Sequence, residues 1–231
     1  DGFKMALDWI SKNDGAADGR VRGILVPREV ETSSLEVLMH TRDAANKRNL
    51  PMATHAAYSV IEFYEVVKEH MKTPIELLDE LDMLRPTLNI GHGNFVADNP
   101  NLNYSGGDDL RLMGEAGASI SHCPINIVRR ARKLDNWKKY ENAGVNMSIG
   151  TDTYPRDIIM NMRTASYLGK IMGNSYFSAK ASDVFRAATV GGAISVGRDD
   201  LGRLEKGALA DIIIIDLTGR GTLRFGPVRD P

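Results

Sequence analysis

Residues 145–152 read Val-Asn-Met-Ser-Ile-Gly-Thr-Asp, a short, largely apolar stretch that ends in an acidic residue. A run of this length in front of a long helical pattern is typical of a buried β-strand, with Asp152 at its carboxyl end. Three earlier stretches have the same plan. They are the strands expected at 51–55, 87–92 and 118–122, which end in His55, His92 and His122.

The spacing of these four polar residues decides the fold. From His55 to Asp152 the successive separations are 37, 30 and 30 residues, and each matches one strand–helix unit. Helical patterns lie between the strands, so the sequence predicts parallel strands joined by right-handed crossovers. A further strand is expected at 22–27, which gives five, whereas a closed (β/α)8 barrel needs eight. The predicted fold class is therefore α/β, a partial TIM-type barrel of five strands.

Local signals place several helix boundaries. Ser33, followed three residues later by Glu36, predicts a capping box. Thr73-Pro74 predicts a helix with proline at its first position. The basic stretch 129–142 is expected to form one helix with a solvated face, and Gly191-Gly192 to break a helix.

Composition narrows the function classes. The chain has 231 residues and a net charge of −1, which gives no overall field for nucleic acid or an anionic membrane. A single cysteine, Cys123, excludes an internal disulfide framework and suits the cytoplasm. The apolar run 212–215 is too short to cross a bilayer. The chain starts at Asp1 without an initiator methionine, so we expect either a piece of a longer polypeptide or a homo-oligomer.

The residue types at the strand ends suit a divalent metal ion. Histidine offers a neutral nitrogen and aspartate a carboxylate, a set typical of zinc, with iron as the alternative. A metal-bound water becomes a hydroxide nucleophile near neutral pH, and a nearby carboxylate can receive its proton. Taken singly, each histidine can equally be a hydrogen-bonded residue of the rim or core.

Four motifs carry a family resemblance. Thr-His55-Ala-Ala, Gly-His92-Gly, Ser-His122-Cys-Pro-Ile-Asn126 and Gly-Thr-Asp152-Thr resemble the later strands of the amidohydrolase superfamily, in its branch of deaminases and chlorohydrolases. The segment 202–211 resembles the family's return into a small β-domain. The resemblance covers roughly residues 20–231. It implies that the five expected strands are about strands 4–8 of the family's (β/α)8 barrel, with a barrel part at 1–200 and a returning β-domain segment at 201–231.

The resemblance also implies roles for individual residues. His55 would be a metal ligand, Asp152 a ligand and proton acceptor, and His92 a hydrogen-bond partner of the substrate or the metal-bound water. His122 and Asn126 would shape the substrate pocket. From the basic stretch, Arg129 or Arg130 is a candidate to reach an anionic group of the substrate.

Two departures from the family pattern matter. The paired His-x-His ligands of the first strand are absent, so His55 and Asp152 alone are expected to bind zinc weakly. Tyr58 stands three residues after His55, where deaminases of this family carry a glutamate that shuttles a proton. Glu62 and Glu65 would replace it only if the backbone bent unusually. Tyrosine is a poor proton acceptor at pH 7 but can form a hydrogen bond with the substrate, so Tyr58 is a catalytic candidate, and packing is its alternative.

The sequence thus predicts a metal-dependent hydrolase in which activated water attacks a C–N or C–Cl bond of a heterocyclic small molecule. A hydrolase of another amide or amidine bond is one alternative. A catalytically silent fragment or scaffold is another, because two metal ligands are missing. The substrate itself depends on loops whose chemistry no motif specifies.

Overall fold

The computed structural model describes residues 2–215. The strands are β1 (Met52–Ala56), β2 (Leu88–His92), β3 (Ser119–His122) and β4 (Asn146–Ile149). The helices are α1 (Gly2–Asn13), α2 (Ala16–Gly19), α3 (Leu35–Arg48), α4 (Val60–His70), α5 (Pro74–Glu80), α6 (Asp109–Glu115), α7 (Pro124–Val128), α8 (Trp137–Asn142), α9 (Ile158–Met172), α10 (Ala181–Arg186) and α11 (Gly192–Ser195), with a π-helical turn η1 (Ala187–Gly191).

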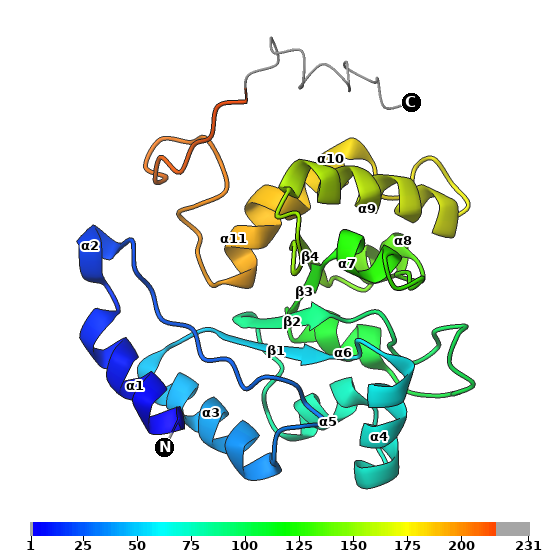
Figure 1. Cartoon of the computed structure of the whole chain (residues 1–231), viewed down its shortest axis with the longest axis horizontal. Helices are drawn as coiled ribbons and strands as arrows, with labels where there is room; N and C mark the ends of the chain where they lie inside the picture. The colour runs from blue at the N-terminus through cyan, green and yellow to red at the C-terminus, as the bar shows by residue number, and fades with distance from the viewer. Residues whose placement is uncertain (1, 216–231) are drawn as a thin grey trace.

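The four strands form one parallel sheet in the order β1-β2-β3-β4 (Figure 1). Neighbouring strands are consecutive in the chain, and at least one helix lies between each pair, which is the crossover arrangement of α/β proteins. The register places His55 opposite Gly91 and Ala56 opposite His92. The predicted α/β class with a parallel sheet is confirmed.

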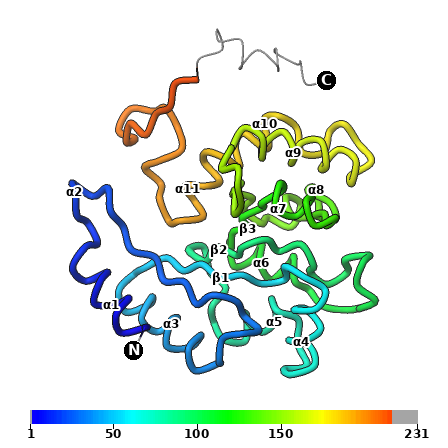
Figure 2. The backbone as a smooth tube through the Cα atoms, viewed as in Figure 1, coloured from blue at the N-terminus to red at the C-terminus, as the bar shows by residue number. Residues whose placement is uncertain are grey.

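The segment expected as a strand at 22–27 forms no regular strand. It meets β1 through two isolated parallel bridges, Leu25 with Met52 and Glu29 with His55. Pro27 lies between the two bridges and has no N–H to donate to a ladder, which explains why the pairing is interrupted. Figure 2 shows this segment, in blue, running alongside β1.

The capping signals are confirmed in one case and corrected in another. Thr73 caps α5, and its hydroxyl and the Glu76 carboxylate form the reciprocal capping box. For α3 the cap is Ser34, whose side chain accepts a hydrogen bond from the N–H of Val37, rather than Ser33. The expected capping box at Ser33 is therefore wrong by one residue.

The basic stretch 129–142 is not one helix. The N–H of Arg132 bonds the carbonyl of Ile127, and Ala131 is left-handed with φ 53°, so the chain turns after α7. Helix α8 then begins at Trp137, and the Asn136 side chain accepts from the N–H of Lys138 at its start.

Strand and helix side chains share one main hydrophobic core. It includes Met52, Leu88, Ile90, Ile120 and Met147 from the strands, and Leu38, Val66, Leu78, Met113 and Trp137 from the helices. The turn η1 and helix α11 pack against β4. Gly191 and Gly192 keep helical dihedral angles, so the expected helix break is wrong. A Cβ on Gly191 would lie 2.1 Å from the Met147 carbonyl oxygen, which shows that close packing on β4 requires this glycine.

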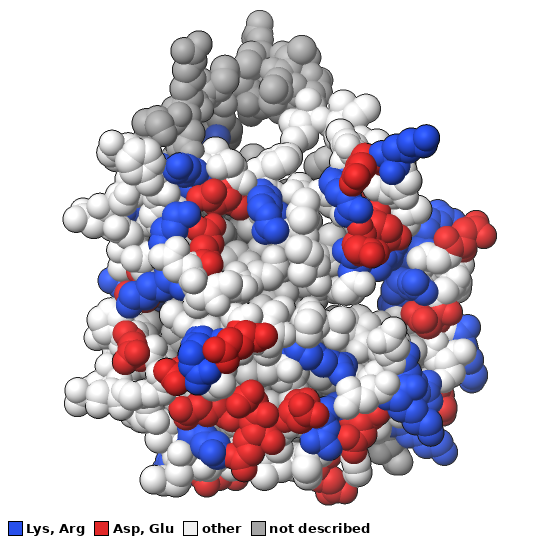
Figure 3. Space-filling view, turned by 180° about the vertical axis from the view of Figure 1, so that it is seen from behind, with Lys and Arg blue, Asp and Glu red and all other residues white. Residues whose placement is uncertain are grey.

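The return segment contains no regular strand in its described part. Ile213 is 76% and Ile214 95% exposed. Residues 216–231, the remainder of that expected segment, lie outside the described residues. Within residues 2–215, no helix is both long and apolar enough to span a membrane. Figure 3 shows basic and acidic side chains interspersed over one face, in keeping with the near-zero net charge.

We expect Gly191→Ala to lower the free energy of unfolding by about 1–3 kcal/mol, because the added methyl group collides with the β4 backbone. Gly192→Ala is the matched control. Its Cβ would meet no atom closer than 3.8 Å, so we expect a gain of about 0.4–1 kcal/mol. Urea unfolding followed by circular dichroism measures both variants. Equal effects in the two variants would contradict the packing described here.

Candidate metal centre

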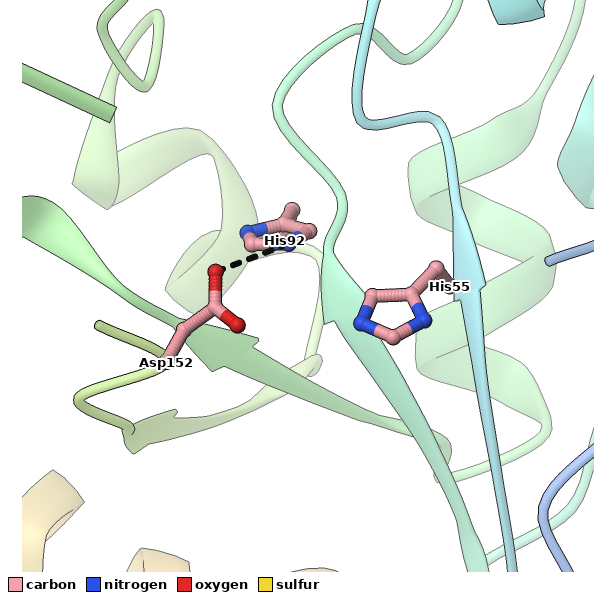
Figure 4. A group of neighbouring side chains, drawn as sticks. All are labelled: His55, His92 and Asp152. Atoms are coloured by element: carbon pink, nitrogen blue, oxygen red, sulfur yellow. Dashed lines mark ion pairs between the residues drawn. The ribbon is translucent and has the colours of Figure 1, made fainter. Parts of the chain in front are cut away.

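Three side chains from separate strand ends meet at the carboxyl edge of the sheet. His55 lies in β1, His92 ends β2, and Asp152 follows β4 by three residues. One ligand atom from each lies within 4.8 Å of the others. Figure 4 shows the three side chains converging, and His92 Nε2 is 3.6 Å from Asp152 Oδ2.

His55 is positioned by its register partner and by a backbone carbonyl. A Cβ on Gly91 would lie 3.0 Å from His55 Cδ2, so the bare glycine leaves room for the imidazole. His55 Nδ1 lies 3.1 Å from the Arg28 carbonyl oxygen. A carbonyl only accepts, so Nδ1 carries the hydrogen and Nε2 keeps the lone pair that binds a metal.

His92 and Asp152 both adopt left-handed backbone conformations, with φ of 76° and 52°. Side chains other than glycine rarely take this conformation, and such strain concentrates at functional sites. Burial lowers the pKa of His92 to about 4, the carboxylate of Asp152 opposes this, and the neighbouring His55 and then the positive charges of Arg130 and Arg132 add to the lowering. His92 is therefore neutral at pH 7, the form that binds a metal or shares a hydrogen bond.

The three residues open onto a cavity of about 360 Å³. Its other lining residues are Arg28, Glu29, Tyr58, Asn126, Arg130 and Thr153. The structure thus brings together five of the predicted site residues, namely His55, Tyr58, His92, Asn126 and Asp152.

His122 and Arg129, also predicted to contact the substrate, do not line this cavity. His122 is 2% exposed and packs edge-on against Trp137, and burial lowers its pKa to about 3. Arg129 donates a hydrogen bond to the Tyr154 carbonyl oxygen at 2.7 Å and lines a neighbouring groove. Substrate contact by these two residues remains a prediction.

A carboxylate beside the centre, that of Glu31, contacts Tyr58. The Tyr58 hydroxyl donates a hydrogen bond to Glu31, and the other Glu31 oxygen is buried without a partner. Burial and this hydrogen bond raise the pKa of Tyr58 well above its usual value. No sequence signal marked Glu31, because it joins the site only when the segment after Pro27 lies beside β1.

Glu62 serves the loop rather than the metal. Its carboxylate accepts hydrogen bonds from the N–H groups of Ala57 and Tyr58 at 2.8 and 3.1 Å. Burial raises the pKa of Glu62 to about 8, against the lowering effect of these bonds. Glu62 therefore fixes the turn after His55, and the backbone bend needed to bring it to the metal is not present.

The donor set fits a zinc ion. Imidazole nitrogen and carboxylate oxygen are ligand atoms that catalytic zinc sites use; His55 and Asp152 supply one of each, and His92 is a candidate third ligand. The lone pair of His55 already faces away from its carbonyl partner, so this ligand needs no change of tautomer.

Comparison with known proteins assigns the chain to a family. The model of the amidohydrolase family matches residues 7–228. The chain belongs to the amidohydrolase family. This confirms the resemblance carried by the four strand-end motifs.

Named relatives of this amidohydrolase chain are deaminases. It is 33% identical, over 93% of its length, to 5-methylthioadenosine/S-adenosylhomocysteine deaminase of Natronomonas pharaonis. It is 28% identical, over 99% of its length, to 5'-deoxyadenosine deaminase of Methanosphaera stadtmanae. The chain covers 48% and 52% of these relatives, so it spans about half the length of the curated relatives it matches.

Solved structures agree with the fold. An adenosine deaminase from Xanthomonas campestris with bound zinc superposes with a TM-score of 0.85 at 25% identity, over 98% of this amidohydrolase chain and 50% of that one. Atrazine chlorohydrolase from Arthrobacter aurescens, complexed with zinc, gives a TM-score of 0.81 at 22% identity, over 94% and 47%. The second similarity concerns the fold alone.

We expect the protein to bind Zn²⁺ here, and His55→Ala or Asp152→Ala to weaken binding at least about tenfold, because each removes one of few ligands. His40→Asn is the control, since His40 is exposed on α3. Competition with a chromophoric chelator and elemental analysis measure zinc binding. His92→Asn then tests whether His92 is a third ligand. If it is, this variant should weaken zinc binding as much as His55→Ala; if His92 is only a hydrogen-bond partner, the loss should be smaller. Tightly held zinc that is unaffected by His55→Ala would contradict the assignment.

Proposed function

We propose that this chain forms part of the active site of a metal-dependent hydrolase that removes an amino group from a nitrogen heterocycle by hydrolysis. The observation that carries the proposal is the convergence of His55, His92 and Asp152 at the carboxyl edge of a parallel sheet. That edge hosts the active sites of parallel α/β barrels. The adenosine-type deaminases among the relatives favour C–N hydrolysis as the reaction.

The residues of the chain have distinct tasks in this proposal. His55 and Asp152 hold a divalent metal ion, zinc in this proposal, which when bound lowers the pKa of a water molecule. Asp152 Oδ2 takes up the proton released at the attacking oxygen. His92 Nε2, 3.6 Å away, stabilises this carboxylate or the attacked heterocycle by a hydrogen bond. Asn126 forms one wall of the cavity.

Tyr58 restricts the leaving group in our proposal. Its proton is donated to Glu31 and its pKa is raised, so it does not act as a base at neutral pH. Delivery of a proton to the leaving group then depends on Asp152 and His92. Leaving groups that need little protonation, such as chloride or an activated amine, should react faster than a poor amine. This supports C–Cl hydrolysis as the second candidate activity.

We further propose that β1–β4 and the segment 22–29 are the later part of a (β/α)8 barrel, with residues 1–200 as the barrel part and 201–231 as the return to a β-domain. Further strands, from a longer polypeptide or another copy, would close the barrel and add ligands. A catalytically silent scaffold is the alternative, which activity of the completed, zinc-loaded protein would exclude.

The functional test compares paired amino- and chloro-substituted purines or triazines, with ammonia and chloride release as the measurements. We expect zinc-dependent turnover that is lost in Asp152→Asn, because the group that both holds the metal and takes up the proton is removed. Tyr58→Phe should slow the chloro substrate about 2–10-fold by loss of the hydrogen bond with Glu31 beside the cavity, and Tyr58→Glu should favour the poor amine.

Tyr104→Phe is the matched control for Tyr58, because Tyr104 packs against Phe63 away from the cavity. If Tyr58→Phe changes both rates by less than about twofold, Tyr58 has no role in the reaction. A wild type that prefers the poor amine contradicts the leaving-group proposal. No turnover of either substrate by the completed protein contradicts the hydrolase proposal itself.

The partial-barrel proposal makes a separate prediction about association. In the described part of the chain, the outer edge of β4 pairs with no strand, and the other edge of the sheet, at β1, meets the segment 22–29 through two bridges only. Unpaired edges favour pairing with another chain. We expect this chain alone to self-associate in light scattering, and to become monodisperse once the barrel is completed. A monodisperse monomer that unfolds cooperatively on its own would overturn the proposal.

A further inference from the structure

The charged side chains that line the metal cavity differ in whether they have a partner of opposite charge. Arg28 Nε lies 3.1 Å from Glu29 Oε1, and Asp152 belongs to the metal centre. Among the described residues that line this cavity, Arg130 is the one charged side chain with neither an ion pair nor a side-chain hydrogen bond. Its guanidinium therefore has donors available for a ligand.

The arginines on either side of Arg130 have structural partners. Arg129 donates to the Tyr154 carbonyl oxygen at 2.7 Å, and Arg132 donates to the Tyr58 carbonyl oxygen at 3.3 Å. Each holds a loop next to the metal centre. Arg130 makes no such contact, although all three lie within four residues of one another.

The local backbone explains why Arg130 faces the cavity and Arg129 does not. Helix α7 separates the metal cavity from a neighbouring groove lined by Ile125, Val128 and Arg129. Residues four apart share one side of a helical turn, and Asn126 and Arg130 both line the metal cavity. The Asn126 side chain is 6% exposed and has no hydrogen bond to the described residues. An amide and a guanidinium are thus placed on one wall.

We infer that Arg130, together with the Asn126 amide, binds a carboxylate on the substrate, so that the site selects aminated heterocycles that carry this anionic group. The inference rests on the proposed function, because it takes the metal cavity as the substrate site. A guanidinium donates two parallel hydrogen bonds to a carboxylate, and the amide N–H₂ can donate another. The sequence alone does not distinguish Arg129 from Arg130 as the candidate for this contact. In the structure Arg129 is engaged with the Tyr154 carbonyl oxygen, which leaves Arg130.

The test uses two probes that differ only in charge, adenine with an acetate group on N9 and the corresponding neutral acetamide. Both are measured on the completed, zinc-loaded protein by calorimetric binding and by kcat/KM. We expect Arg130→Gln to weaken binding and kcat/KM for the acetate about tenfold, and for the acetamide less than about twofold. Arg130→Lys, which keeps the charge but loses the paired donors, should recover part of the difference.

Lys133→Gln is the matched control, since it removes the same charge three residues further on and lies outside the cavity lining. Equal losses for both probes in Arg130→Gln, or a loss as large in Lys133→Gln, would overturn the inference. So would a wild type that binds the acetamide as tightly as the acetate. Two outcomes separate the inference from the proposed function. Turnover of both probes with an unchanged ratio of kcat/KM values in Arg130→Gln refutes the inference alone. Binding of the acetate without turnover counts against the proposed function alone.

Discussion

The parallel register of the four short strands is the constraint on which the metal centre depends. It sets His55 opposite Gly91 and His92 opposite Ala56. Successive side chains of a regular strand point to opposite faces, but His92 ends β2 with a left-handed φ of 76°, and the two imidazole rings stack with their centroids 5.4 Å apart. A slip of one residue would turn His55 to the other face of the sheet and place a larger residue against its ring. Because β3 and β4 keep the same direction, the chain after β4 brings Asp152 back to that edge.

Hydrogen bonds from residues outside the strands stabilise strained backbone conformations at the carboxyl edge of the sheet. Ala57, His92 and Asp152 all have positive φ, and such backbone strain persists only where the surroundings determine it. Tyr140, fully buried, donates to the Gly93 carbonyl oxygen at 2.6 Å, directly after His92. The contacts of Arg132 and Glu62 act in the same way on the turn that carries Tyr58.

The sequence predicted what local period and spacing determine. The four strands, the capped start of α5 and the meeting of His55 with Asp152 follow from apolar stretches of strand length that end in polar residues. It failed at two local interruptions of the chain and at one contact distant in sequence. The strand at 22–27 is interrupted at Pro27, and the turn at Ala131 divides the basic stretch. Glu31 reaches Tyr58 across 27 residues, a pairing that no local pattern encodes.

The buried carboxylate of Glu62 has a consequence for the motions of the site. It joins the amides of Ala57 and Tyr58 to the first turn of α4, where its own N–H bonds the Ser59 hydroxyl. Amide hydrogens in an exposed turn exchange rapidly with deuterium. Because these two are bonded to Glu62, their exchange requires the start of α4 to open. The turn after His55 and the start of α4 should therefore exchange as one cooperative unit, at the slow rate of the helix.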